Sequence, residues 1–166
     1  MLPLIQTLFD IVRLRKGPEH IPRSSILLMI AIGLWVFAVL SQTLVIDRRG
    51  EADFGYEVLS ALIAVICYSV ILMTFGKSGR LVQTVTAAFG CSSLLIVALT
   101  IGSAVSTLAG SPTMMALFFW IYLPWALAVR GHIISRAIDR HWYLGITFAV
   151  LIFVLQYVFV IGFRTN

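Results

Sequence analysis

Five long stretches without a charged residue constrain this chain more than any other feature of its sequence. They cover Ile26–Ile46, Val58–Phe75, Leu81–Ala109, Thr113–Val129 and Trp142–Phe163. A helix needs about 20 apolar residues to cross a hydrocarbon core of about 30 Å. Strands of membrane β-barrels instead alternate polar and apolar residues over about ten positions. The sequence therefore predicts an all-α, polytopic membrane protein, a single domain over residues 1–166 with a bundle of five transmembrane helices.

The composition supports this class and excludes others. Only 11% of the residues are charged and 60% are apolar, whereas an average soluble domain carries roughly 25% charged residues. The net charge of +5 does not indicate nucleic-acid binding, because the basic residues flank the apolar spans and form no single surface. We expect membrane lipids as partners, and no nucleic acid.

The positions of the basic residues predict the orientation in the membrane. One side of the bundle collects nine of them: Arg13, Arg15, Lys16, Arg23, Lys77, Arg80, Arg130, Arg136 and Arg140. The other side holds three: Arg48, Arg49 and Arg164. Cytoplasmic flanks of membrane helices carry the excess of Lys and Arg. We therefore expect the N-terminus in the cytoplasm and the C-terminus outside, which requires an odd number of spans.

Residues 1–16 have an amphipathic helical pattern. One face would carry the apolar side chains of Leu4, Ile5, Leu8, Phe9 and Val12, and the opposite face those of Gln6, Asp10 and Arg13. This pattern predicts a helix that lies in the cytoplasmic membrane interface and ends before Gly17-Pro18. The alternative is a helix that packs against a partner or against the rest of the chain.

Two basic groups are candidate contacts for lipid headgroups. The first is Arg13, Arg15 and Lys16, at the end of the N-terminal helix. The second is His132, Arg136 and Arg140, which are four residues apart and would share one face of an amphipathic connection over Arg130–Tyr143. The alternative for the second group is the ordinary solvated face of a cytoplasmic hairpin.

Small residues recur at every fourth position of the third span, at Ala98, Gly102, Ser106 and Gly110. Close backbone approach drives helix association in lipid, where little hydrophobic force acts between helices. We expect a continuous packing groove and interpret this helix as the central packing element. A helix of the same chain is the favoured occupant, and a helix of another protein is the alternative.

Pro124 predicts a kink in the fourth span, because proline cannot donate to the carbonyl four residues earlier. Trp120, Tyr122 and Trp125 surround this position. These four residues are candidates for the wall of a cavity that holds a lipid or an apolar solute. The more ordinary interpretation is a packing kink near the membrane interface.

No motif indicates enzyme chemistry, and we assign no catalytic, metal or cofactor-binding residue. Ion-coupled transporters usually need an ionisable residue inside the membrane, and none lies within the five stretches. An enzyme with a cytoplasmic-face site at His132, Asp139 and His141 is the least favoured hypothesis, since these residues lack the spacing of known metal or acid–base sites.

The amphipathic leader and the sequence Gly17-Pro18-Glu19-His20-Ile21-Pro22-Arg23-Ser24 resemble those of small uncharacterised bacterial inner-membrane proteins. The five-span plan with a cytoplasmic N-terminus is also similar to that of Yip1-like membrane proteins. This resemblance implies the bacterial inner membrane and a role in membrane organisation or trafficking-type interaction. The paired tyrosine-containing motifs of eukaryotic Yip1 members are absent, so no functional residue carries over.

Short loops and spans without charges favour a non-enzymatic function. We expect an accessory or scaffold subunit that packs against other membrane proteins, a second copy of itself, or lipids. The alternative is a carrier or binder of a lipid or an apolar solute.

Overall fold

The computed structural model describes residues 2–46 and 54–164, and these ranges contain helices and turns but no strand. The elements are α1 (Leu2–Val12), η1 (Pro18–His20), α2 (Ser25–Ile46), α3 (Phe54–Thr74), η2 (Ser78–Arg80), α4 (Leu81–Leu108), α5 (Pro112–Ala137) and α6 (Trp142–Arg164). Helices α2 to α6 are each long and apolar enough to cross a membrane. The predicted all-α polytopic fold is confirmed.

Helices α3 and α5 extend by several residues beyond their uncharged stretches. Helix α5 continues eight residues beyond Val129 and so contains Arg130. Helix α3 begins at Phe54 and has Glu57 in its first turn. The expectation that no ionisable residue lies in a spanning helix is therefore wrong. Seventeen uncharged residues are at the short end of the range for a span. Helix α5 continues past them to Ala137, and Asp139, with a φ of 53°, follows its C-cap Ile138.

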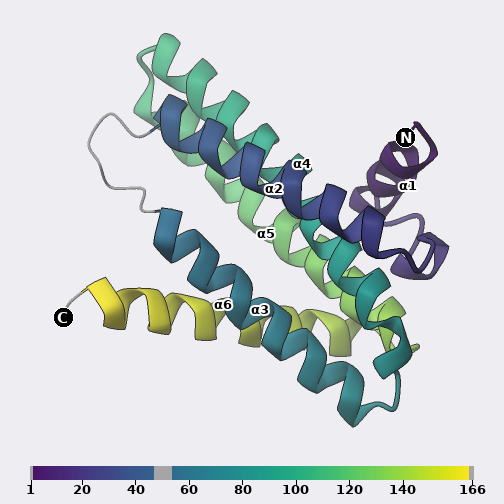
Figure 1. Cartoon of the computed structure of the whole chain (residues 1–166). Coiled ribbons are helices and arrows are strands. Elements are labelled where there is room, and N and C mark those ends of the chain that lie inside the picture. Colours follow the sequence, from purple (N-terminus) through teal and green to yellow (C-terminus); the bar gives the residue numbers. More distant parts are fainter. Residues whose placement is uncertain (1, 47–53, 165–166) are drawn as a thin grey trace.

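Helix α4 is the centre of the bundle. It packs against α1, α2, α3 and α5, and it buries a larger share of its residues than any other spanning helix. Its interpretation as the central packing element is confirmed. Figure 1 shows α2, α4 and α5 running alongside one another, with α3 and α6 on one side of this group.

We call the region of η1, η2 and the α5–α6 connection the basic end of the bundle. Two apolar cores lie toward the basic end. One joins α1 and η1 to α4 and α5 around Ile11 and Ile133, and the other joins α3, α5 and α6 around Leu72 and Ile134. The carboxylate of Asp139 pairs there with Lys77 at 2.7 Å and with Arg80 at 2.8 Å.

Helix α1 packs against this end of the bundle. Leu8 and Ile11 are buried, and Leu8 occupies the space that a side chain at Gly90 would need. Phe9, which we expected on the same apolar face as Leu8, is half exposed. The structure thus shows the alternative of packing within the chain, and α1 ends at Val12 rather than at residue 16. The side chains of Leu4 and Ile5 lie outside the described residues.

The expected small-residue groove is shorter than its sequence pattern. The ring of Phe118 in α5 fills the space beside Gly102, and Ser106 is also buried. Ala98, however, is exposed. Gly110 lies beyond the end of α4 and adopts a φ of 62°, the left-handed conformation that glycine tolerates in a turn. The expectation of one continuous groove over four positions is therefore wrong, and at Gly102 the position is packed by a helix of the same chain.

Candidate functional site: a polar cavity among five helices

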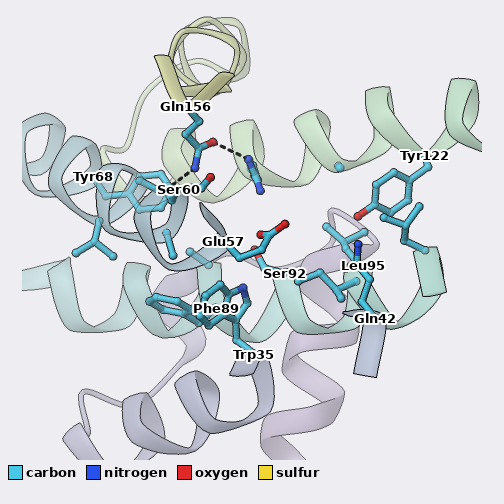
Figure 2. Close-up of a pocket in the computed structure, with 18 residues that line it drawn as sticks. Trp35, Gln42, Glu57, Ser60, Tyr68, Phe89, Ser92, Leu95, Tyr122 and Gln156 are labelled. Carbon is cyan, nitrogen blue, oxygen red and sulfur yellow. Dashed lines mark hydrogen bonds between the residues drawn. The ribbon is translucent and has the colours of Figure 1, made fainter. Parts of the chain in front are cut away.

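A cavity of about 200 Å³ lies among the five spanning helices, and every one of them contributes to its wall. Space of that size holds more than a single water molecule. Figure 2 shows the side chains of Gln42, Glu57, Tyr122 and Gln156 converging on it from four different helices. The wall therefore combines polar groups with apolar ones, which is the usual composition of a ligand site.

Hydrogen bonds fix the guanidinium group of Arg130 at one wall. Its Nη1 donates to Oε1 of Gln156 in α6 at 3.2 Å. The Nε2 of Gln156 in turn donates to the backbone carbonyl of Ser60 in α3 at 2.7 Å. One buried amide therefore joins three helices and holds Arg130 at the cavity. Seven residues separate Arg130 from the end of α5, which places it about 10 Å inside the helix.

Glu57 provides the opposite charge. It lies in the first turn of α3, where the helix dipole favours a carboxylate. Figure 2 shows its carboxylate directed into the cavity. Among the described residues, no ion pair within 4.0 Å joins Glu57 to Arg130. Two opposite charges therefore line the same space without neutralising each other by direct contact.

Aromatic and small residues form the rest of the wall. Trp35 of α2 meets Phe89 of α4 edge to face, with ring centroids 5.3 Å apart. Tyr122 of α5 stacks on Phe118 at 6.0 Å. These ring contacts restrict the motion of Trp35 and Tyr122 at the cavity, and Ser92 adds a hydroxyl group from α4.

Of the four residues expected to form a cavity wall around the kink, only Tyr122 lines the cavity. Trp120 is 78% exposed and Trp125 is 44% exposed, and Pro124 is also exposed. The expectation for those three residues is wrong because they lie on the outer face of α5. Positions on one helical face recur every three or four residues. The cavity face of α5 is accordingly Tyr122, Ala126 and Arg130, a spacing of four that the sequence already contained.

The two basic groups are also arranged differently from the expectation. His132 is buried, and its Nε2 donates to the backbone carbonyl of Lys16 at 2.9 Å. Arg136 is exposed, whereas Arg140 lies beyond the end of α5, with its guanidinium 6.0 Å from the ring centroid of Phe75. The predicted stripe of His132, Arg136 and Arg140 is therefore wrong.

At the N-terminal helix, Arg13 and Arg15 are exposed and remain candidates for headgroup contact. Lys16 forms an ion pair of 2.7 Å with Asp10. This hydrogen-bonded ammonium lowers the pKa of the Asp10 carboxyl group. The ammonium group of Lys16 is thus paired within the chain, although its side chain remains partly exposed.

The hypothetical enzyme site gains no support from the geometry at the basic end. The carboxylate of Asp139 is held by Arg80 and Lys77, which lower its pKa to about 2, while His132 is bonded to a backbone carbonyl. His141 is exposed. Within residues 2–46 and 54–164, no group of three or more His, Cys, Asp or Glu side chains is placed to hold a metal ion.

Comparison of the chain with protein-family models, with curated proteins and with solved structures found no match. The class of the protein is therefore inferred from its own sequence and structure. It is an all-α membrane protein with five apolar helices long enough to span a bilayer and a charged cavity among them.

Proposed function

We propose that this protein binds an amphiphilic molecule of the membrane and holds its polar headgroup in the cavity. The observation that carries the proposal is the presence of Glu57 and Arg130 on the wall of one cavity that all five spanning helices line. Charged groups inside a bilayer are costly, and they usually mark a binding site or a pathway. The lipid or solute binder that the sequence left as an alternative is the function favoured by this geometry.

The dimensions and lining of the cavity support an amphiphile over a purely apolar solute. Glu57 and Tyr68, both on the wall, are eleven residues apart on α3, which corresponds to about 16 Å along the helix. Leu95, Ile96 and Leu99 line the α4 side and offer apolar contact to a hydrocarbon chain. Gln42, Glu57 and Arg130 instead require a polar group.

We also propose that the basic end faces the cytoplasm and that the membrane is the bacterial inner membrane. Arg130 turns toward the cavity, so eight basic residues, not nine, flank the spans on that side, against three on the other. The excess still satisfies the positive-inside rule. Arg48 and Arg49, on which this comparison partly depends, lie outside the described residues. The role of accessory or scaffold subunit remains a prediction, which proteins that co-purify with the chain would support.

A bulky residue in the cavity wall tests the binding function. Ala61 lines the cavity, whereas its neighbour Leu62 is 55% exposed on the outside of α3. We expect wild-type protein released gently from native membranes to retain bound lipid in native mass spectrometry. Ala61→Trp should lose it because the indole fills the headgroup space, and Leu62→Trp should keep it. Equal retention by both variants would contradict binding in this cavity.

A further inference from the structure

We infer that the headgroup bound in this cavity is a zwitterion, with its anionic group at Arg130 and a primary ammonium group at Glu57. This inference rests on the proposed binding function and adds the chemical class of the ligand. Its basis is the separate placement of two opposite charges on one cavity wall.

Arg130 provides the anion subsite. A guanidinium group carries five N–H donors in a planar fork, which suits two-point contact with a phosphate or a carboxylate. Within the described residues, the hydrogen bond that Arg130 donates goes to Gln156, which leaves further donors for a ligand. Gln156 is itself held by the carbonyl of Ser60. The guanidinium is therefore positioned before any ligand arrives, which lowers the entropy cost of binding.

Glu57 provides the cation subsite. Its side chain extends into the cavity (Figure 2) and forms no ion pair with another described residue. A carboxylate accepts hydrogen bonds, and a primary ammonium group supplies three donors. A trimethylammonium group has no N–H and would lose this contact. Glu57 therefore favours a primary amine over a quaternary one.

The charges on the cavity wall favour a zwitterionic headgroup over a purely anionic one. Among the residues that line the cavity, Glu57 is the acidic one and Arg130 the basic one. Electrostatic interactions are strong where water is scarce, and a charge inside a bilayer without a partner is costly. A purely anionic headgroup would satisfy Arg130 but bring a second negative charge toward Glu57. A zwitterion satisfies both residues and leaves the occupied cavity neutral.

Two sources offer this chemistry, the phosphoethanolamine headgroup of a lipid and a soluble zwitterion of similar size. The test uses nanodiscs that contain equal amounts of phosphatidylethanolamine, phosphatidylglycerol and phosphatidylcholine, followed by native mass spectrometry of the released protein. We expect wild type to retain phosphatidylethanolamine about ten-fold over either of the other lipids, the ratio that corresponds to about 1.4 kcal/mol. Retention without headgroup preference would overturn the inference and leave the proposed binding function standing.

Variants assign the two subsites. Glu57→Gln removes the carboxylate at an exposed position in the first turn of α3, and it should abolish the preference for phosphatidylethanolamine over phosphatidylglycerol. Arg130→Gln should reduce retention of both lipids about ten-fold. Arg136→Gln, an exposed arginine on the same helix, is the matched control and should behave as wild type. An unchanged preference for phosphatidylethanolamine in Glu57→Gln would overturn the inference. If Arg130→Gln does not fold, the result for Glu57→Gln is sufficient to test the inference.

Free phosphoethanolamine identifies the source. It is titrated by calorimetry against wild type and Glu57→Gln in nanodiscs of phosphatidylcholine alone. Binding that depends on Glu57 indicates a soluble zwitterion, and no binding together with retained phosphatidylethanolamine indicates the lipid. Both results support the inference. If wild type binds no phosphoethanolamine in this titration and retains no lipid from the mixture, the proposed binding function is contradicted as well.

Discussion

The basic end of the bundle and the part that surrounds the cavity pack their helices in different ways. At the basic end, side chains join elements that are distant in sequence. Gln83 of α4 donates to the carbonyl of Ile21, and Asp139 joins the α5–α6 connection to Lys77 and Arg80. Toward the middle of the bundle the five helices surround a cavity with charges on its wall. The contrast is between an end where side chains fix the helices to one another and a part where the helices leave an open space between them.

Small residues explain the tight packing near the basic end. Gly145 of α6 lies directly against Gly131 of α5, so closely that a Cβ atom at Gly145 would collide with the Gly131 carbonyl oxygen. Such glycine contacts allow two helix backbones to approach in lipid. The cavity wall instead combines large side chains such as Trp35 and Tyr122 with small ones such as Ala61, and the helices leave space between them there.

The largest expected effect comes from adding one methyl group at this contact. A Cβ at Gly145 would also lie 2.7 Å from the Cβ of Ser135, whereas one at Gly33 of α2 would meet nothing within 4 Å. We expect Gly145→Ala to lower the free energy of unfolding by about 2 to 3 kcal/mol. Gly33→Ala should be neutral or stabilise by up to about 1 kcal/mol through helix propensity. Thermal unfolding in detergent measures the stability of both variants. Equal stability of the two would contradict the tight helix contact at Gly145.

A smaller effect is expected from the ion pairs of the basic end. Arg80 first and Lys77 second lower the folded-state pKa of Asp139 to about 2, below an unfolded value of about 3.9. The ionised carboxylate therefore stabilises the fold above about pH 4, and this contribution is lost as the pH falls toward 2. Because the side chain is half exposed, its contribution is less than about 1 kcal/mol.

Asp139→Asn isolates this charge, since asparagine also tolerates the positive φ of this position. The variant should unfold at a lower temperature than wild type at pH 6, and the two curves should coincide near pH 2. A difference that persists at the low pH would show that the carboxylate charge is not its cause.

The sequence predicted the fold more completely than the site. Uncharged length and hydropathy were sufficient for five helices, because the bilayer imposes both. The same rule placed Glu57 and Arg130 outside the membrane, since each is the first charged residue beside an uncharged stretch. The fourth stretch, with seventeen uncharged residues, is at the short end of the range for a span, which is consistent with a helix that continues through Arg130.

The placement of the cavity depended on which helices meet, and the sequence did not supply that information. Aromatic residues around Pro124 suggested a wall, but most of them are exposed on α5. The contact between Gln156 and Arg130 joins residues 26 positions apart on two helices. Helical spacing groups residues on one helix, and it does not identify the facing residues of another.

The measurement that tests the account most directly is the chemical accessibility of two adjacent serines on α4. Ser92 lines the cavity, whereas Ser93 is buried and donates to the carbonyl of Gly90. Each is replaced by cysteine in a background in which Cys67 and Cys91 are alanine, and the protein in nanodiscs is treated with aminoethyl methanethiosulfonate. We expect Ser92→Cys to react and Ser93→Cys to remain unmodified. Equal reactivity at the two positions, or none at Ser92→Cys, would contradict an accessible polar cavity among the five helices.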